Sequence, residues 1–412
     1  MRSWHRERTA DNSRLSSKFP VIDRRYFSRD DYGEIQARYF SDLRASSAVD
    51  ADPSGWLGTY SRAEEYVRLP KLESRDLARY YIDEGSALGP DKEAICELVT
   101  AWEGFPVTPQ ELTLCPSGAS ISLVTLAALK SAGVDRVLFE TPGYFGTIEQ
   151  AAEIGLPFEL LPTYRDSNFE LPDLRRTLSR KGKVALWLTQ PRASLGFDQS
   201  PQRLASLLEE IGPGYMVVDE ATDQSFPTHL AGLRRSADSG NLIRLRSFTK
   251  GMGLNGLRLA AAIHAPAFRS TMLDCLEAFG GSLDVHSLRA VGLLGRDIPR
   301  LRSMLTAANR QVNDLRARAE RLTRGSPLQV NRLTNGYIGS MLADLTALGR
   351  SHAARRNRLL AGCRAARTPV ILGASMYLAR DHPFEAIRLN FFNQPEHILR
   401  GLTNVLGILE QS

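Results

Sequence analysis

A lysine, three glycines and an arginine lie close together in residues 247–258. This stretch reads Ser-Phe-Thr-Lys-Gly-Met-Gly-Leu-Asn-Gly-Leu-Arg, which places Lys250 eight residues before Arg258. A lysine amine beside an arginine and a phosphate site can be activated for imine chemistry, and the arginine can bind the phosphate with two hydrogen bonds. The glycines permit tight turns of the backbone. The stretch therefore predicts imine chemistry at Lys250 next to a phosphate site.

Polar residues also follow two apolar segments elsewhere in the chain. Gly118, Ala119 and Ser120 come after residues 112–115 and begin a helical pattern, so their backbone N–H groups can attract an anion. An ordinary turn from strand to helix has the same pattern. Asp219 ends another apolar segment, and a buried carboxylate needs a partner, which can be a ligand or a structural cap. Ligands of open α/β sheets lie at the carboxyl ends of the strands, so both groups are candidates for one site.

The stretch around Lys250 resembles the pyridoxal-phosphate (PLP) attachment signature of the class I and II aminotransferases, and it fits every position of that signature. The wider resemblance spans residues 85–270, with a further match at Arg388. It implies that Lys250 holds PLP as a Schiff base and later transfers a proton, while Asp219 pairs with the pyridinium nitrogen. It also implies that five residues hold the phosphate: Gly118, Ala119, Ser120, Ser247 and Arg258.

Two further residues match positions of the same family. Tyr144, in Thr-Pro-Gly-Tyr-Phe, resembles the aromatic residue that stacks on the cofactor ring. Arg388, in Ala-Ile-Arg-Leu-Asn-Phe, resembles the arginine that binds the α-carboxylate of the substrate, and a bidentate arginine–carboxylate pair suits an amino acid. An exposed loop aromatic and a surface salt bridge are the structural alternatives for these two residues.

The sequence departs from the family at two positions near the cofactor ring. Ala193 stands where the family usually has an asparagine, and Thr222 stands where it usually has a tyrosine. Both of the usual residues donate hydrogen bonds to the ring oxygen O3′, and the asparagine also helps to bind the substrate carboxylate. Thr222 is therefore the expected cofactor-binding residue at its position, and Thr222 or Arg192 could replace the missing donors.

Three functions are compatible with these residues. The resemblance implies an aminotransferase that moves an amino group between an L-amino acid and a 2-oxo acid. The changes at Ala193 and Thr222 keep open other PLP chemistry of specialised metabolism, namely a lyase, decarboxylase, oxidase, or carbon–carbon bond-forming or cyclising enzyme, including one that acts on an S-adenosylmethionine-like substrate. A ligand-sensing regulator is disfavoured because the N-terminal segment does not resemble a winged-helix DNA-binding domain.

Alternating helical and apolar segments indicate the elements that position these residues. Helical patterns occur near residues 91–102, 119–132, 145–154, 170–180 and 201–211. Short apolar runs occur at residues 112–115, 136–140, 158–161, 184–188, 215–218, 242–245 and 259–263. Such runs predict buried strands of an α/β protein with a mostly parallel, seven-stranded sheet. The last connection is too short for a parallel crossover, so the seventh strand should be antiparallel to the sixth.

The resemblance assigns these strands to the large domain of a fold type I PLP enzyme. We expect three parts: residues 1–84, with an N-terminal arm and part of the small domain; residues 85–310, the PLP-binding large domain; and residues 311–412, a C-terminal small domain of α+β type. A helical pattern at residues 30–45 belongs to the first part. The resemblance also implies a homodimer whose active sites are shared between subunits.

The composition excludes several classes of protein. The 412 residues are 43% hydrophobic and 24% charged, as in ordinary globular proteins. Apolar runs are shorter than the roughly 18–20 residues that span a bilayer, and no apolar segment of a secretory signal follows Met1, so no membrane association is expected. The four cysteines form no CxxC pair, which argues against a metal site or a disulfide framework and favours reduced thiols in the cytoplasm.

The charge pattern bears on possible partners. The net charge is +6, which suits small anionic ligands. Residues 350–367 are rich in arginine and predict an amphipathic helix with Leu359 and Leu360 inward. Four arginines should then face outward: Arg355, Arg356, Arg358 and Arg364. Because no aromatic residues lie between them, a solvated helix face is favoured over a nucleic-acid-binding patch.

Overall fold

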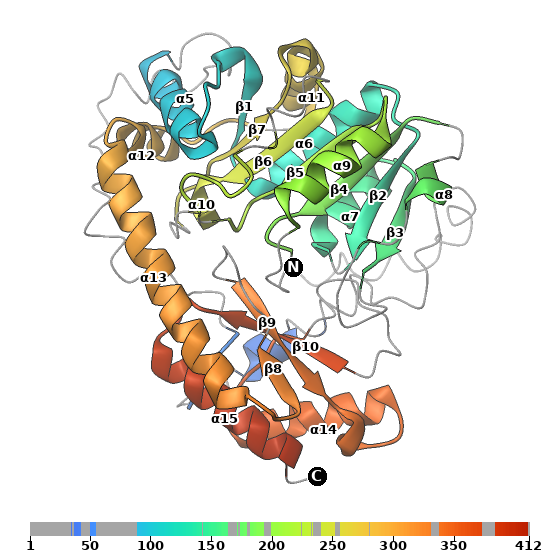
Figure 1. The fold of residues 1–412 in the computed structure, drawn as a ribbon, viewed down its shortest axis with the longest axis vertical. Helices are drawn as coiled ribbons and strands as arrows, with labels where there is room; N and C mark the ends of the chain where they lie inside the picture. Colours follow the sequence, from blue (N-terminus) through green and yellow to red (C-terminus); the bar gives the residue numbers. More distant parts are fainter. Residues whose placement is uncertain are drawn as a thin grey trace, which may run out of the picture.

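The computed structural model contains a seven-stranded sheet and a three-stranded sheet, which lie towards opposite ends of the long helix α13 (Ile298–Thr323; Figure 1). The structure describes residues 34, 37–42, 50–54, 89–141, 143–163, 171, 174–178, 182–192, 199–223, 225–231, 233, 240–251, 256–279, 281–330, 338–372 and 384–410.

The large sheet has the order β1-β7-β6-β5-β4-β2-β3. Its strands are β1 (Leu112–Cys115), β2 (Arg136–Thr141), β3 (Phe158–Pro162), β4 (Val184–Thr189), β5 (Tyr215–Asp219), β6 (Leu242–Ser247) and β7 (Ala260–Ile263). Strand β7 is antiparallel to both of its neighbours, β1 and β6, and the remaining pairs are parallel. The predicted strands and the reversed seventh strand are thus confirmed.

Helices cover both faces of this sheet. One face packs against α6 (Gly118–Ser131), α7 (Phe145–Glu153) and α11 (Arg269–Phe279), and the other face packs against α9 (Pro201–Ile211). Helix α5 (Gly89–Glu103) lies against α12 (Val285–Gly295) beside β1 and β7 (Figure 1). Short helical segments complete this region: η1 (Pro109–Glu111), α8 (Arg175–Leu178), α10 (Phe248–Gly251) and η3 (Pro266–Phe268).

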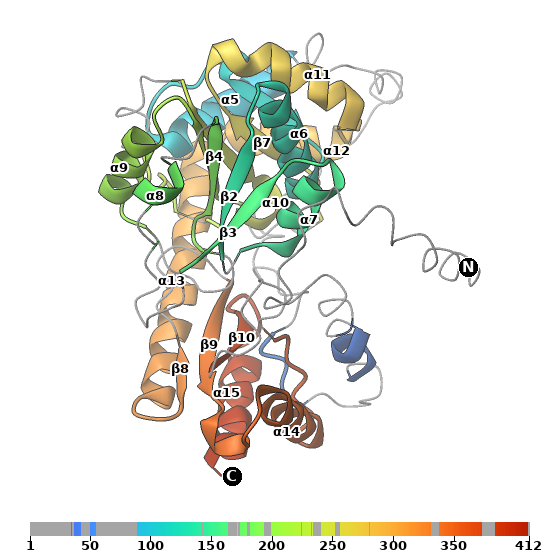
Figure 2. The same ribbon diagram turned by 90° about the vertical axis from the view of Figure 1, so that its right-hand side faces the viewer.

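The smaller sheet has the order β10-β9-β8 and is antiparallel throughout. Its elements are β8 (Leu328–Val330), β9 (Ile338–Asp344), η4 (Thr346–Leu348), α14 (His352–Ala365), β10 (Phe384–Asn390) and α15 (Pro395–Glu410). The described part of the N-terminal segment contacts this region, since Asn390 N–H donates to Pro53 O at 2.9 Å. Asp42 accepts from Arg364 on α14 at 3.0 Å, and Figure 2 shows the N-terminal helical turn beside α14.

Helix α14 forms where predicted, with Leu359 buried, Leu360 half-buried, and Arg358 and Arg364 exposed. The prediction that Arg355 and Arg356 face outward was wrong, because both are half-buried. Their long side chains reach back to polar groups of the protein: Arg355 donates to Gly349 O, and Arg356 lies 3.3 Å from a carboxylate oxygen of Glu385.

The expected domain boundary at residues 310/311 falls inside α13, which runs from the large sheet to the small one (Figure 1). The division into 1–84, 85–310 and 311–412 therefore stays a prediction. A helix was expected at residues 170–180, and the described residues of that range form one short helix, α8.

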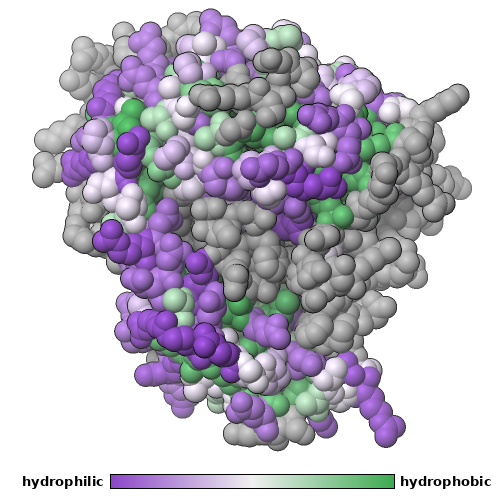
Figure 3. All heavy atoms as spheres, viewed as in Figure 1, coloured by the Kyte–Doolittle hydropathy of each residue, from purple (hydrophilic) through white to green (hydrophobic). Residues whose placement is uncertain are grey.

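Helix α13 carries hydrophilic side chains along its outward face (Figure 3). Within the described ranges, no helix is both long and apolar enough to cross a membrane. The same ranges contain no group of three or more histidine, cysteine, aspartate or glutamate side chains that could hold a metal ion.

A close approach of α12 to α5 depends on Gly295. A Cβ atom at this position would overlap the main-chain carbonyl of Ala94, which belongs to α5 and cannot easily shift. Gly295→Ala should therefore lower the free energy of unfolding by about 1–3 kcal/mol. Gly407→Ala on α15 is the matched control, because a Cβ there meets nothing within 4 Å, and it should raise stability by about 0.5–1 kcal/mol. Denaturant titration measures both changes, and equal effects would contradict this packing.

Candidate active site

The candidate residues gather at one edge of the large sheet. Strands β1, β5 and β6 point the same way, because β7 is antiparallel to both β1 and β6. Their carboxyl ends therefore lie on the same edge, where Gly118 follows β1, Asp219 ends β5 and Ser247 ends β6. Lys250 belongs to α10, the short helix that starts directly after β6.

Lys250 is half-buried, and its surroundings favour the neutral amine. Its backbone N–H donates to Ser247 Oγ at 3.3 Å, and its Nζ lies 5.5 Å from the ring centroid of Tyr144. Burial lowers the pKa of Lys250, and the positive charges of Arg388 and Arg258 lower it further, whereas Asp219 acts in the opposite direction. A larger share of neutral amine makes Lys250 a better nucleophile at neutral pH.

Asp219 is a buried carboxylate, 7% exposed, close enough to Lys250 for the two charges to interact. The backbone N–H of Ala221 donates to its Oδ1 at 3.0 Å. Burial raises the pKa of Asp219, the neighbouring charge of Glu220 raises it further, and the hydrogen bond and Lys250 lower it. A cation bound against this carboxylate would stabilise its ionised form, so Asp219 fits a protonated ring nitrogen.

The first turn of α6 has the features of an anion site. Ser117 caps the helix, since its Oγ accepts from Ser120 N–H at 3.0 Å and lies 2.9 Å from Ser120 Oγ. A Cβ atom built on Gly118 would meet nothing within 4 Å, so the backbone is open at this point. The following Ala119 is exposed. The backbone N–H groups at the start of a 14-residue helix suit a phosphate group.

Arg258 comes from the segment that enters β7, and its side chain is exposed. Its backbone N–H donates to Ser287 Oγ at 2.8 Å, and Ser287 in turn donates to Asp284, the N-cap residue of α12. The helix cap thus holds the backbone of Arg258 in place. The positive charge of Arg258 lowers the pKa of Lys250, so the two side chains interact electrostatically.

Arg388 lies on β10 of the smaller sheet and is buried, with 4% exposure. Its backbone is held on both sides, because its N–H donates to Ile371 O at 2.9 Å and its carbonyl accepts from Ser54 Oγ at 2.6 Å. The charge of Arg388 lowers the pKa of Lys250, so the small sheet contributes a cation beside the candidate amine. Tyr144 is 38% exposed, and its ring lies near the Lys250 amine.

Of the two positions that depart from the family, the structure describes one. Ala193 lies outside the described residues, and Thr222 is half-buried in the turn after Asp219. Arg192 is buried and its Nε lies 3.2 Å from a carboxylate oxygen of Glu140, whose other oxygen accepts from the backbone N–H of Thr189 at 2.7 Å. Arg192 is therefore paired with Glu140 near the end of β2. Its suggested hydrogen bond to the ring oxygen O3′ stays a prediction.

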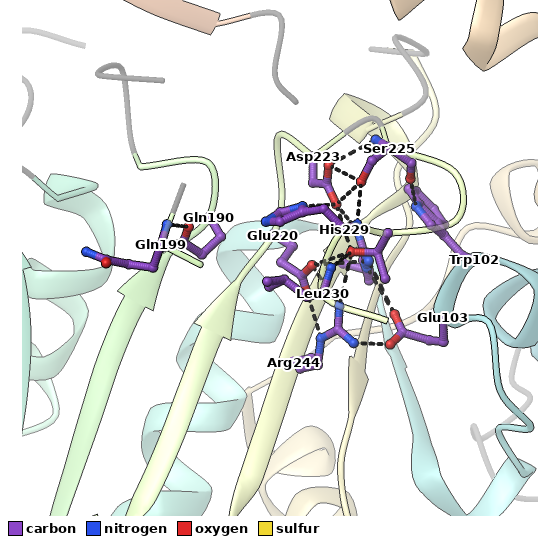
Figure 4. A network of polar contacts seen from close by, with 12 residues as sticks. Trp102, Glu103, Gln190, Gln199, Glu220, Asp223, Ser225, His229, Leu230 and Arg244 are labelled. Carbon is purple, nitrogen blue, oxygen red and sulfur yellow. Dashed lines mark hydrogen bonds and ion pairs between the residues drawn. The ribbon is translucent and has the colours of Figure 1, made fainter. Parts of the chain in front are cut away.

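Two groups of polar residues near this edge were not predicted. Tyr39 is buried and donates to both carboxylate oxygens of Asp52, at 3.1 and 3.0 Å; burial and Asp52 raise its pKa, and Arg388 lowers it. A second group, the buried charge cluster, lies beside the carboxyl ends of β5 and β6 (Figure 4). Its charged members are Glu103, Glu220, Asp223, Arg244 and Arg246. Two arginines alternating with apolar residues in a buried strand were the available signal.

The described residues fit PLP. An open helix N-terminus suits the phosphate, a buried carboxylate suits the ring nitrogen, and an amine with a lowered pKa suits covalent attachment. The buried Arg388 supplies a cation for a substrate carboxylate.

Comparison with known proteins agrees with this geometry. Residues 88–325 match the family described as aminotransferase class I and II. The chain is 26% identical over 237 residues to histidinol-phosphate aminotransferase of Macrococcus caseolyticus. The aligned residues make up 54% of this chain and 60% of that protein. It is 24% identical over 184 residues to histidinol-phosphate aminotransferase of Deinococcus radiodurans, and this alignment makes up 44% of the chain and 49% of that protein. The matches thus span about half to three fifths of these relatives.

Solved structures resemble the chain over nearly its whole length. An aspartate aminotransferase from Thermus thermophilus with maleate is 18% identical, with a TM-score of 0.70, and covers 96% of this chain and 98% of its own. A methionine aminotransferase from Escherichia coli is 15% identical, with a TM-score of 0.71, and covers 92% and 97%. At these identities the similarity shows the fold, a large α/β domain with a smaller domain.

Proposed function

Since the chain belongs to the aminotransferase class I and II family, whose members use PLP, we propose that it transfers an amino group between an L-amino acid and a 2-oxo acid. The observation that carries this proposal is the position of Lys250. Its amine lies beside the charges of Asp219 and Arg388, and its pKa is lowered. An amine in this state can both attach the cofactor and carry a proton.

Each candidate residue has a proposed task. Lys250 attaches PLP and moves a proton at its Nζ, and Asp219 keeps the ring nitrogen protonated. Bound PLP supplies an electron sink for the substrate α-carbon. The phosphate is bound by Gly118, Ala119, Ser120, Ser247 and Arg258.

The remaining tasks concern the ring and the substrate. Tyr144 covers one face of the ring and Thr222 is the hydroxyl near its oxygen O3′. Arg388 binds the substrate carboxylate, which orients the α-carbon towards Lys250. The relatives named above are aminotransferases, and this favours amino transfer over elimination, decarboxylation or ring closure.

The proposal is tested by incubating the protein and PLP with a panel of L-amino acids and a 2-oxo acid. Chromatography should detect equal amounts of a new amino acid and a new 2-oxo acid. Release of ammonia or carbon dioxide without amino transfer would overturn the proposal in favour of other PLP chemistry.

Arg388→Lys should raise KM for the amino acid about 10- to 100-fold and change kcat much less. Lysine keeps the positive charge but cannot form the paired hydrogen bonds of a guanidinium with a carboxylate. Steady-state kinetics separates the two constants. Arg310→Lys, on the exposed face of α13, is the control and should leave both constants unchanged. A native KM in Arg388→Lys would contradict the assignment.

We also propose a homodimer with shared active sites, as in the family, located in the cytoplasm. Sedimentation measures the assembly, and a strictly monomeric, fully active species would contradict it.

A further inference from the structure

The buried charge cluster consists of two arginines and three carboxylates that come from different parts of the large domain. Arg244 and Arg246 lie on one face of β6, because they are two residues apart in a strand. Glu220 directly follows β5, Asp223 lies in the next turn, and Glu103 ends α5. All five side chains are at most 1% exposed. Figure 4 shows Glu103, Glu220, Asp223 and Arg244 converging, with Trp102, Ser225 and His229 around them.

Glu220 is bound by both arginines. Arg244 donates to it twice, from Nε at 2.6 Å and from Nη2 at 2.8 Å, and Nη2 of Arg246 lies 3.1 Å from its Oε1. Its backbone N–H donates to Leu245 O at 2.9 Å, and Thr228 Oγ1 adds a further contact at 3.2 Å. The end of β5 is therefore tied to β6 by side chains as well as by the strand pairing.

Asp219 and Lys250 depend on the same two strands. Successive residues of a strand face opposite sides, so Asp219 faces away from Glu220, and Ser247 faces away from Arg246. Ser247 accepts the backbone N–H of Lys250 at 3.3 Å. A shift of Glu220 against its two arginines would therefore change the separation of Asp219 from Lys250.

The carboxylates of the cluster differ in how strongly their surroundings favour the ionised form. Three carboxylates face two guanidinium groups, so a fully ionised set has one excess negative charge. Arg244 and Arg246 lower the pKa of Glu220, although burial opposes them, whereas burial raises the pKa of Glu103. Loss of the negative charge is therefore expected to disturb the contacts of Glu220 more than those of Glu103.

We propose that Glu220, held by Arg244 and Arg246, is a positioning residue that sets the geometry between Asp219 and Lys250 for the cofactor. This inference rests on the proposed function. Glu220 does not touch the reacting groups and acts through the strand that carries Asp219.

The test compares Glu220→Gln with Glu103→Gln. Both substitutions are the same, both side chains are fully buried, and both contact the same two arginines, but Glu103 lies on α5, which carries none of the candidate cofactor residues. Cofactor-free protein is titrated with PLP, and the dissociation constant and the absorbance spectrum of the bound cofactor are recorded. Thermal unfolding of the cofactor-free variants measures their stability separately.

Glu220→Gln should raise the dissociation constant for PLP at least about tenfold and alter the bound spectrum, because the carboxylate of Asp219 is displaced from the ring nitrogen. Glu103→Gln should stay within about twofold of the native constant with an unchanged spectrum. If both variants change the constant and the spectrum in proportion to their loss of stability, the cluster is structural only and the proposal is overturned.

A second variant tests the proposal in case Glu220→Gln does not fold. Arg244→Lys keeps the positive charge but loses the two-point contact with Glu220, and it should also alter the spectrum and weaken PLP binding relative to Glu103→Gln. A native spectrum and constant in this variant would overturn the proposal. Native protein that binds no PLP would overturn the proposed function and this inference together.

Discussion

Lys250→Ala is expected to leave no covalent cofactor on the protein and to lower kcat/KM by about 10⁴-fold. The side chain supplies both the amine that attaches PLP and the group that moves a proton, so the variant loses both contributions. Borohydride reduction of the native protein, followed by peptide mass spectrometry, should find the adduct on Lys250. The same procedure should find no adduct in the variant.

Lys183→Ala is the control for this experiment. Lys183 lies just before β4, at the opposite edge of the sheet, where its Nζ donates to Ala132 O at 3.1 Å and lies 4.6 Å from the ring centroid of Tyr215. This variant should retain the adduct and the native activity. An adduct on Lys183 in the native protein would remove the basis for the proposed site.

Asp219→Asn is expected to lower kcat by about 10²–10³-fold while the covalent link to Lys250 persists. A buried carboxylate beside the ring nitrogen favours its protonated form, and an amide of the same shape removes that charge. Because Asp219 is buried next to Lys250, water cannot replace the lost interaction effectively. Stopped-flow and steady-state kinetics measure the loss.

Asp135→Asn provides a matched substitution at the opposite edge of the sheet. Asp135 precedes β2, and its carboxylate accepts the backbone N–H of Lys183 at 2.6 Å. Its effect on kcat should remain below about twofold. Native kcat in Asp219→Asn, with a full complement of PLP, would contradict the role given to Asp219.

Local sequence patterns predicted the strands well but could not predict their order. Each apolar run ends within two residues of the end of the observed strand, since strands buried on both faces consist mostly of apolar side chains. The reversed β7 was predictable because residues 247–258 leave no room for a helical crossover. The order of β4, β2 and β3 depends on helices packing across the sheet, which no local pattern records.

The candidate site was predictable where a functional group ends a strand or matches a family motif. Asp219 and Lys250 belong to that kind, and the structure places their charges close together. The buried charge cluster was not predicted, because Glu103 and Arg244 are 141 residues apart and only folding brings them together. Tyr39 and Asp52 were missed for a different reason, since nothing in the N-terminal pattern indicates a buried pair near Arg388.

The most direct test of an amino-transferring PLP enzyme is a single half-reaction. Protein loaded with PLP is mixed with an excess of an amino acid that serves as donor, with no 2-oxo acid present, and the absorbance of the cofactor is followed. We predict that the band of the aldehyde form is replaced by that of pyridoxamine phosphate, in an amount equal to the active sites, and that added 2-oxo acid restores it. Consumption of the amino acid without formation of pyridoxamine phosphate would contradict the proposed function.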